Sequence, residues 1–459
     1  MVAPPQGLPA PFLVEARDAL GAHVITDPEV AAPHATDWTG RFTGHPRAVL
    51  RPGTVAEVAA VVDSARRHGV ALIPQGGNTG LVGGATPVDG EVVVDLRRLD
   101  AVTDVDPVGG QLTAGAGATI AAVQASARSA GWAYGVDWAA RDTATIGGSV
   151  ATDAGGLRFV RHGSTRRQLL GVEAVLGTGS VIRHLPLVEK DTTGYDLAAL
   201  LCGSEGTLGL VTAARLHLVA PPGPLATALV GFATTAQAVV AASTLRRALP
   251  GLEAVELMLE AGLGLVREAT GLAAPLATDA PVMLLVEASA PDAPETVLAD
   301  AVAALVGVVA AAVAVDGPRR AQLWRYREDH TASISRLGPP HKFDVTLPAG
   351  ELAAFIDAVP ALVASVVPDA RTWCFGHAAD GNVHVNVTGL VADDERVAEV
   401  VLSQVAELGG SISAEHGIGR AKRRWLHLAR SPADLAAMRA VKAALDPAGI
   451  CNPSVLLPP

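Results

Sequence analysis

Residues 74–84 read PQGGNTGLVGG and place five glycines within nine positions, directly after a predicted strand at 70–73. Because glycine has no Cβ, successive backbone N–H groups of such a loop can turn inward and form a nest for an anion such as a pyrophosphate. A flexible surface loop would explain one glycine-rich segment equally well. The rest of the sequence is therefore needed to choose between these interpretations.

Two further glycine-rich segments lie in the first half of the chain. Residues 145–158 read TIGGSVATDAGGLR, and residues 202–209 read CGSEGTLG. Three loops of this kind predict an extended ligand held along its length, such as a dinucleotide. No G-x-G-x-x-G opens a βαβ unit, and neither a Gly-Lys-Ser/Thr signature nor a G-x-S-x-G motif occurs. These absences argue against a Rossmann site, a P-loop and a serine-hydrolase elbow.

The composition is that of a folded, acidic chain. Its 459 residues are 49% apolar and 18% charged, which predicts two to four domains at roughly 100–200 residues each and excludes intrinsic disorder. Lys and Arg number 35 and Asp and Glu number 46, so the net charge is −11. This balance is opposite to the basic footprint of nucleic-acid-binding proteins, and we expect no nucleic-acid partner.

The cysteines and the apolar runs bear on location. Cys202, Cys374 and Cys451 are widely spaced and indicate neither a disulfide framework nor a paired zinc motif. Residues 1–20 lack the charged and apolar regions of a signal peptide. The longest apolar run, 301–315, is shorter than the roughly 20 residues that span a bilayer. We therefore expect a cytoplasmic protein with no membrane span.

Turn and capping signals divide the chain into parts. Thr54-x-x-Glu57 is a capping box that predicts a helix over 55–67, and Pro221-Pro222-Gly223-Pro224 marks the clearest domain boundary. Before this boundary we expect strands at 70–73, 91–96, 171–176 and 209–218. After it we expect helices at 235–248 and 294–307, a strand at 282–287 and a helix from Ala421.

Residues 375–387, FGHAADGNVHVNV, indicate a metal site. Valines alternate with His384 and Asn386 as in a strand with one polar face. Asp380-Gly381 predicts a two-residue hairpin turn, which would place His377 directly opposite His384 with Cβ atoms roughly 4.5–5.5 Å apart. That separation suits two ligands of one metal ion, although isolated histidine pairs are more often structural.

A third, anionic ligand is predicted at Glu415, within residues 413–419, SAEHGIG. Two histidines and one glutamate with an open position are typical of catalytic zinc, and manganese or iron stays open. The alternative for Glu415 is a solvated loop carboxylate.

Residues 324–331, WRYREDHT, and 341–348, HKFDVTLP, contain a candidate carboxylate site. Arg327 and Thr331 are four apart, so one helix face would present both to a single carboxylate. An exposed surface pair is the alternative. Lys342 is one of only four lysines and opens a strand-like run, which favours a functional role.

Together, the three glycine-rich segments, H-x-x-D-G-N-x-H-x-N at 377–386 and E-H-G-I-G at 415–419 resemble FAD enzymes of the vanillyl-alcohol-oxidase type. The resemblance is greatest to the D-lactate, glycolate and D-2-hydroxyglutarate dehydrogenase branch. It implies an α+β protein with an FAD-binding domain of two α+β subdomains, a substrate domain with a mainly antiparallel sheet, and a C-terminal helical segment that completes the active site. The implied ranges are 1–221, 222–413 and 414–459.

The resemblance also implies the cofactor contacts. Neither His nor Cys occurs between residues 74 and 87, where histidine-linked relatives attach their flavin, so we expect non-covalent FAD. Asp153 stands where relatives often have Asn. The implied FAD contacts are Gly76, Gly77, Asn78, Thr79, Gly80, Gly83, Gly147, Gly148, Thr152, Gly155, Gly156, Gly206 and Asn452.

The implied reaction is oxidation of a D-2-hydroxy acid to the 2-oxo acid, with the electrons passing to the flavin. By resemblance, His377, His384 and Glu415 hold a divalent metal, most simply zinc, and His416 accepts the hydroxyl proton. The implied substrate-binding residues are Arg327, Thr331, Lys342 and Asn386. The R-E-x-x-T and K-x-D-V-x-L-P patterns are closer to the D-2-hydroxyglutarate type than to the glycolate type.

Several alternatives stay open at this point. The substrate can be D-lactate or glycolate, and the electron acceptor can be an electron-transfer protein, a quinone or oxygen. The oligomeric state, including a homodimer, is undetermined. A metal-dependent hydrolase in which His377, His384 and Glu415 activate water is a more remote reading, as is a non-catalytic flavin-binding sensor or scaffold.

Overall fold

A computed structural model describes residues 7–314, 316–391 and 393–458. The predicted features at residues 1–6 and at Val315 lie outside the described residues. The chain forms two compact units. The first unit contains residues through 156, 163–221 and 415 onward, and the second contains 157–162 and 222–414. The short segment 157–162 thus leaves the first unit, joins the second, and returns.

The first unit begins with a four-stranded sheet of order β1-β2-β4-β3, in which β2, β4 and β3 run parallel. Helix α3 (Val55–His68) begins where Thr54 Oγ1 accepts the N–H of Glu57, and it ends at Gly69, whose φ is positive. The strands are β1 (Val24–Ile25), β2 (Val49–Leu50), β3 (Leu72–Gln75) and β4 (Val92–Asp95).

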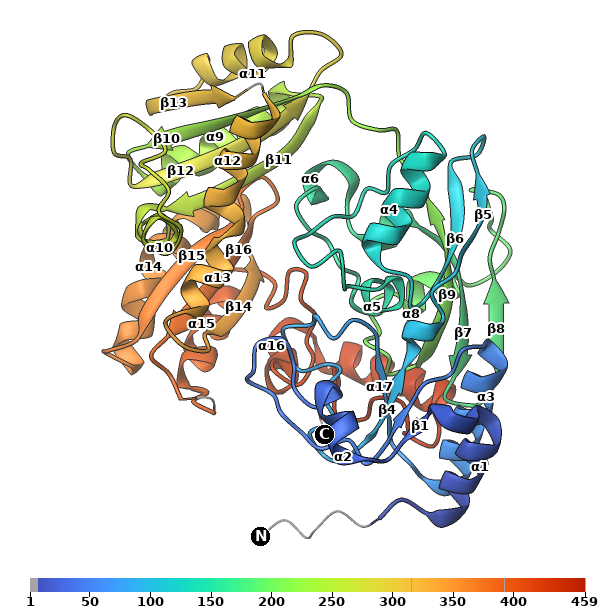
Figure 1. The fold of residues 1–459 in the computed structure, drawn as a ribbon. Helices are drawn as coiled ribbons and strands as arrows, with labels where there is room; N and C mark the ends of the chain where they lie inside the picture. The colour runs from blue at the N-terminus through green and yellow to red at the C-terminus, as the bar shows by residue number, and fades with distance from the viewer. Residues whose placement is uncertain (1–6, 315, 392, 459) are drawn as a thin grey trace. The chain divides into compact units, whose positions relative to one another are not determined.

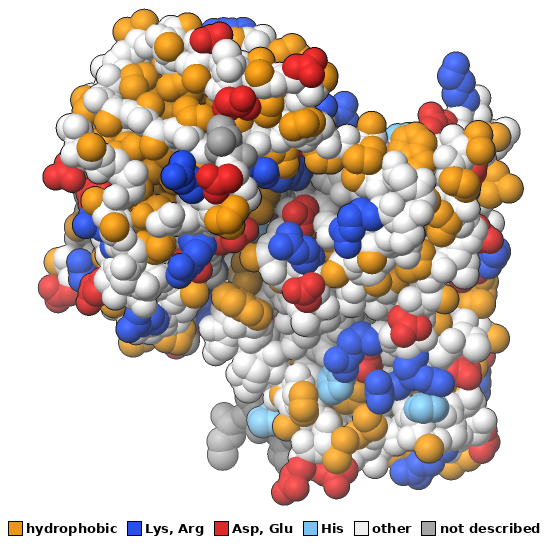
Figure 2. All heavy atoms as spheres, turned by 45° about the horizontal axis from the view of Figure 1, so that its top comes forward, with side chains coloured by type: hydrophobic (Ala, Val, Ile, Leu, Met, Phe, Trp, Pro, Cys, Tyr) orange, Lys and Arg blue, Asp and Glu red, His pale blue; other side chains and the backbone are white. Residues whose placement is uncertain are grey.

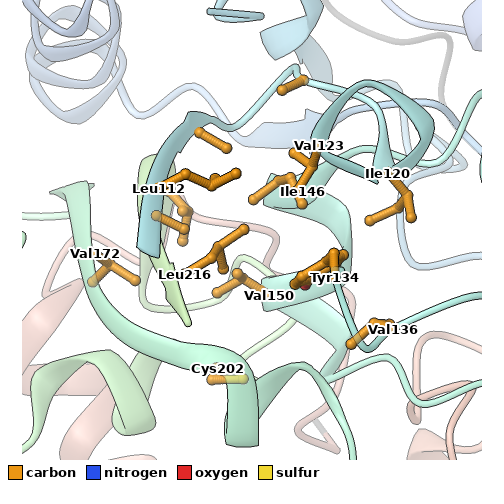
Figure 3. Close-up of a cluster of buried hydrophobic side chains, with 14 of the residues drawn as sticks. Leu112, Ile120, Val123, Tyr134, Val136, Ile146, Val150, Val172, Cys202 and Leu216 are labelled. Carbon is orange, nitrogen blue, oxygen red and sulfur yellow. The ribbon is translucent and has the colours of Figure 1, made fainter. Parts of the chain in front are cut away.

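A five-stranded antiparallel sheet completes the first unit, in the order β5-β6-β9-β7-β8. Helices α4 (Ile120–Ser129) and α5 (Ile146–Thr152) contribute apolar side chains that converge with those of β6 and β9 in one buried cluster (Figure 3). The strands are β5 (Val102–Asp106), β6 (Gln111–Gly115), β7 (Leu169–Leu176), β8 (Val181–His184) and β9 (Gly209–His217).

The first unit has further helical elements. They are α1 (Ala10–Leu20), η1 (Gly21–His23), α2 (Pro28–Ala31), η2 (Ala32–His34), η3 (Leu96–Arg98), α7 (Thr165–Gln168), α8 (Leu197–Leu201), η4 (Arg423–Trp425), α16 (Leu426–Ala429) and α17 (Pro432–Leu445).

The predicted helix from Ala421 is wrong in its position. The backbone N–H groups of Arg420 and Ala421 both donate to Val82 O, which ties this stretch to the loop after β3. A 3-10 turn and the short α16 follow. The long helix α17 begins after Ser431, whose side chain forms a capping box with Asp434. A local cap, and not the apolar pattern, therefore sets the start of the terminal helix.

The second unit contains a seven-stranded sheet of order β13-β10-β12-β11-β15-β16-β14, in which every neighbouring pair is antiparallel (Figure 1). The strands are β10 (Leu225–Phe232), β11 (Leu252–Leu259), β12 (Val282–Ser289), β13 (Val308–Ala314), β14 (His341–Thr346), β15 (Arg371–His377) and β16 (Asn382–Thr388). Its helices are α6 (Phe159–His162), α9 (Thr235–Ala248), α10 (Glu260–Thr270), α11 (Pro294–Ala303), α12 (Gly317–Glu328), α13 (His330–Ser335), α14 (Ala349–Val366) and α15 (Arg396–Glu407).

Helix α14 is the one helix of the described residues that is long and apolar enough, by length and composition, to cross a membrane. Its buried side chains are Leu352, Phe355, Ile356, Val359 and Val363, which recur at helical spacing along one face. That pattern is typical of a helix that covers a sheet within its own domain.

On the face shown in Figure 2, acidic and basic side chains are interspersed.

Two local predictions in the second unit need correction. Asp380-Gly381 does not form a two-residue turn, because β15 and β16 are joined by four residues, 378–381. Phe375, and not His377, lies opposite His384. His377 instead pairs with Glu256 of β11, and β15 ends at His377, before the predicted turn.

The predicted single helix through Arg327 and Thr331 is divided. Helix α12 ends at Glu328 and α13 begins at His330, with Asp329 as the cap residue of both. The two proposed carboxylate-binding side chains therefore belong to consecutive helices.

Candidate functional site

The first unit contains a cavity with about 1030 Å³ of empty space, part of it open to solvent. The loop after β3, the start of α5 and the loop before β9 surround it. The proposed contacts among its lining residues are Gly76, Gly77, Asn78, Thr79, Gly80, Gly147, Gly148, Thr152, Gly206 and Asn452.

Glycine is required where these loops press together. A Cβ on Gly76 would collide with the Thr145 side chain, and one on Gly77 would collide with the backbone of Thr143. The loop after β3 therefore lies directly against the segment that leads into α5, so that backbone from both segments borders the cavity. Close backbone approach of this kind is what a long, polar ligand needs.

Asn452 supplies an observation that points to a ligand. Its side-chain N–H groups donate to Gly84 O at 2.9 Å and to Glu205 O at 2.7 Å. Its Oδ1 is buried and accepts no hydrogen bond within the described residues. A buried acceptor that lines a cavity fits a hydrogen-bond donor of a bound cofactor. The glycine loops and this amide together fit a dinucleotide such as FAD.

Three proposed contacts lie outside the lining of the cavity: Gly83, Gly155 and Gly156. Gly83 has a φ of 68°, and a Cβ there would meet the ring of Phe42 at 2.7 Å, so its role is to allow a turn. The N–H of Gly156 donates to Glu415 Oε2 at 2.9 Å.

The carboxylate of Asp153 also lies outside the cavity lining. It accepts the backbone N–H of Arg166 at 2.9 Å and Arg166 Nε at 3.0 Å. The residue that departs from the resemblance therefore forms an ion pair within the first unit.

Glu205 holds the segment that carries the proposed base. Its two carboxylate oxygens accept the backbone N–H groups of Ile418 at 2.8 Å and Gly419 at 2.7 Å. Gly417 and Gly419 have φ of 80° and 54°, which the tight turn around this carboxylate requires. Burial raises the pKa of Glu205, and the two N–H donors offset part of that rise. His416, just before this turn, lines the cavity together with Glu205.

Sequence reasoning did not select Glu205, although it selected the adjacent Gly206. The available signal was an acidic residue within a glycine-rich run. The contacts of Glu205 join positions more than 200 residues apart, and no local pattern reports them. Trp138 is a second lining residue that the sequence did not single out.

The second unit brings His377 and His384 together. Because His377 follows Phe375 by two residues, it lies on the same face of the sheet as the cross-strand pair Phe375–His384. The centroids of the two imidazole rings are 5.2 Å apart, and the rings are nearly perpendicular. The predicted proximity of these side chains is therefore present, although the predicted turn is not.

Each of these histidines has a carboxylate partner at Nδ1. His377 Nδ1 lies 2.6 Å from Glu256 Oε1, and His384 Nδ1 lies 3.1 Å from Asp344 Oδ1. The side chain of Asn382 donates to the same Asp344 oxygen at 2.8 Å. Metal-ligating histidines commonly donate their second ring N–H to a carboxylate, which orients Nε2 toward the metal. The carboxylate contacts of the two imidazoles are therefore those expected of metal-ligating histidines.

Arg327 lies beside the same carboxylate. Its side chain is buried, its Nε donates to Glu256 Oε2 at 2.6 Å, and its guanidinium lies 4.6 Å from the centroid of the Phe375 ring. Burial alone would raise the pKa of Glu256, but the charges of His377 and Arg327 outweigh that effect and hold the pKa below its usual value. Thr331 is half-buried one helix further on.

Lys342 and Asn386 lie directly opposite each other on β14 and β16. Asp344 and His384 also lie opposite each other, two residues further along these strands. Because side chains alternate between the two faces of a sheet, both pairs lie on the same face. Burial lowers the pKa of Lys342 to about 8. The second unit thus has a face with two proposed metal ligands and three of the proposed substrate-binding side chains, Arg327, Lys342 and Asn386. The proposed ligand Glu415 and the proposed base His416 belong to the first unit.

Comparisons with known proteins show which family the chain resembles. Residues 46–184 match the family model described as FAD binding domain, and residues 222–456 match FAD linked oxidases, C-terminal domain. The chain is 38% identical to D-2-hydroxyglutarate dehydrogenase of Xanthomonas citri pv. viticola over 94% of this chain and 93% of that protein. It is 36% identical to the mitochondrial D-2-hydroxyglutarate dehydrogenase of Bos taurus, over 98% of this chain and 85% of that protein.

Solved structures are similar in fold at lower identity. p-Cresol methylhydroxylase has a TM-score of 0.78 at 16% identity, covering 98% of both chains. 4-Ethylphenol oxidase from Gulosibacter chungangensis has a TM-score of 0.77 at 17% identity, covering 99% of both. The predicted α+β fold class and the predicted FAD cofactor are confirmed by these comparisons.

Proposed function

Because the chain belongs to the family of FAD-linked oxidases, we propose that it is a D-2-hydroxyglutarate dehydrogenase, which oxidises D-2-hydroxyglutarate to 2-oxoglutarate. The observation that carries this proposal is the polar face of the second unit, where Glu256 contacts both Arg327 and His377, and His377 lies beside His384. A cationic side chain beside two oriented imidazoles suits a substrate that has a carboxylate next to a hydroxyl group.

In this proposal Arg327, Thr331 and Lys342 bind substrate carboxylate, and Asn386 contributes an amide. Arg327 and Lys342 offer positive charge from a partly desolvated environment, where an ion pair with a carboxylate is stronger than in water. A dicarboxylic acid has two carboxylates that can pair with these two positive charges, whereas D-lactate and glycolate each have one.

His377, His384 and Glu415 would hold the metal, for which we propose zinc. A bound divalent cation supplies a Lewis acid that lowers the pKa of a hydroxyl group. His416 accepts the hydroxyl proton, a role for which imidazole is well suited near neutral pH. FAD, held by the glycine loops that line the cavity, would supply the acceptor for the two electrons released from the substrate.

We also propose that FAD is bound non-covalently and that the protein works in a reducing compartment. No cysteine is among the described residues that line the cavity, and its one lining histidine, His416, has the proposed role of base. All three cysteines are free and buried, as is usual in reducing compartments.

The test is anaerobic reduction of the purified protein by a panel of hydroxy acids. D-2-hydroxyglutarate should bleach the visible absorbance of the flavin, and L-2-hydroxyglutarate should not. Faster bleaching by D-lactate or glycolate would replace the proposed substrate with that acid. A flavin that none of these acids reduces would overturn the proposed function.

A further inference from the structure

One buried carboxylate in the second unit is shared between two functional side chains. Glu256 lies on β11 and is 1% exposed. Its Oε1 lies 2.6 Å from His377 Nδ1, and its Oε2 lies 2.6 Å from Arg327 Nε. The proposed metal ligand and the proposed substrate-binding arginine are therefore held by the two oxygens of a single side chain.

The backbone makes this arrangement rigid. Glu256 and His377 are directly opposite in the antiparallel pair β11–β15, whereas Arg327 comes from the last turn of α12. Phe375 lies under the Arg327 guanidinium and opposite His384. A buried charge without a partner is costly, so movement of either His377 or Arg327 away from Glu256 is opposed by the desolvated carboxylate.

From this geometry we propose that Glu256 is a positioning residue that couples metal binding to substrate binding, an inference that rests on the proposed function. Through Oε1 it accepts the Nδ1–H of His377 and so presents the Nε2 lone pair to the metal. Through Oε2 it fixes the guanidinium of Arg327. Glu256 contacts neither the metal nor the substrate in this proposal, and it acts through the two residues that do.

The variant that tests the proposal is Glu256→Gln. The amide has the same shape, but only one of its two polar atoms can accept a hydrogen bond. Its NH₂ group must therefore face either Arg327 Nε–H or His377 Nδ1–H, and a donor would meet a donor. A change of ring tautomer or a displaced guanidinium would follow, and either disturbs one of the two sites.

Metal affinity is the first measurement, made by competition between chelator-stripped protein and a chromophoric chelator for Zn²⁺. We expect Glu256→Gln to bind Zn²⁺ about 10–100-fold more weakly than the wild type, the usual effect of losing an orienting partner of a metal ligand. The matched control is Glu253→Gln, because Glu253 is on the same strand and equally buried but pairs with Arg161 and Ser289. That control should bind Zn²⁺ like the wild type.

The second measurement is the KM for D-2-hydroxyglutarate at saturating Zn²⁺, with flavin content and far-UV circular dichroism as checks on folding. Glu256→Gln should raise KM as well as weaken Zn²⁺ binding, with unchanged flavin content. If it fails to fold, Glu256→Asp keeps the charge but is one methylene shorter and cannot reach both partners, so it too should weaken Zn²⁺ binding.

The outcomes separate this inference from the proposed function. A folded Glu256→Gln or Glu256→Asp protein with wild-type Zn²⁺ affinity overturns the inference. A wild type that binds no Zn²⁺ overturns the inference together with the metal part of the proposed function. A wild type that binds Zn²⁺ but does not oxidise D-2-hydroxyglutarate overturns the proposed substrate alone, and weaker Zn²⁺ binding by Glu256→Gln then still supports the positioning role at the metal.

Discussion

The two units hold their proposed catalytic histidines by different means. In the first unit, Glu205 accepts two backbone N–H groups, at Ile418 and Gly419, and so fixes the turn that follows His416. In the second unit, Glu256 contacts the imidazole of His377 itself. A carboxylate bound to backbone fixes the position of a loop, whereas one bound to an imidazole also fixes which ring nitrogen carries the proton.

This difference has a chemical reason in the proposed function. A general base has to accept and release a proton, and the Glu415 carboxylate lies 3.8 Å from His416 Nε2, farther than Glu256 Oε1 lies from His377 Nδ1, at 2.6 Å. A metal ligand has to keep one tautomer, so an anionic partner at Nδ1 is useful. If Glu205 positions the backbone and Glu256 fixes a tautomer, substitutions of the two carboxylates should have different effects.

The largest effect is expected at the metal ligands. His384→Ala should lower kcat/KM by more than the ~10²–10³-fold that loss of one preorganised hydrogen-bond donor costs, because the metal site itself is lost. Flavin content should not change, since the cavity belongs to the first unit. Steady-state kinetics together with the flavin spectrum of the purified variant check this.

The control for that variant is His341→Ala. His341 is a buried histidine of β14 that lies on the opposite face of the strand from Asp344, and its Nε2 contacts Val391 O. It should retain most of the activity. Equal losses in the two variants would mean that the effect of His384→Ala is a general one on folding.

Glu205→Gln should act through the first unit. The amide can accept only one of the two N–H groups, and the other would be left buried at a cost of about 1–3 kcal/mol. A shifted turn would displace His416. A displacement of about 1 Å costs about 100-fold in rate. Zn²⁺ affinity should fall less than in Glu256→Gln, because His377 and His384 keep their carboxylate partners and only Glu415, next to His416, is near the shifted turn. If Glu205→Gln weakens Zn²⁺ binding and leaves kcat intact, the contrast between the two carboxylates is wrong.

Lys342 should give the second unit a pH dependence. Burial lowers its pKa to about 8, so the side chain is charged below this pH and loses its proton as the pH rises through it. We expect kcat/KM, which reports the free enzyme, to fall above about pH 8. In Lys342→Arg the charge persists, and this fall should disappear. A profile that is the same in both proteins would remove Lys342 from substrate binding.

How far the sequence predicts these sites depends on how far apart in the chain the interacting residues lie. The alternation of residues 383–387 correctly placed His384 on a polar face, and His377 shares that face because the true register differs from the predicted one by two residues. An even shift preserves the face of a strand. The turn itself was wrong because β11 pairs with His377, a contact that Asp380-Gly381 cannot report.

The supporting carboxylates could not be predicted for the same reason. Glu256 and His377 are 121 positions apart in the chain, and Glu205 and Ile418 are 213 apart. Local patterns specify glycine loops, caps and strand faces. They carry no signal for a single buried glutamate whose partner comes from a distant element.

The smallest effect is expected at Asp153, a third carboxylate that can be compared with Glu205 and Glu256. Its partner Arg166 is 44% exposed, and an ion pair of this kind contributes about 0–1 kcal/mol. Asp153→Asn keeps an acceptor for the Arg166 N–H but loses the charge, so thermal unfolding should show a decrease of at most about 1 kcal/mol. Because the carboxylate is outside the lining of the cavity, flavin affinity and kcat should be unchanged. A marked change in flavin affinity would mean that the charge at this position acts on the cofactor from outside the lining, and that the first unit controls its ligand through more than the backbone loops and Glu205.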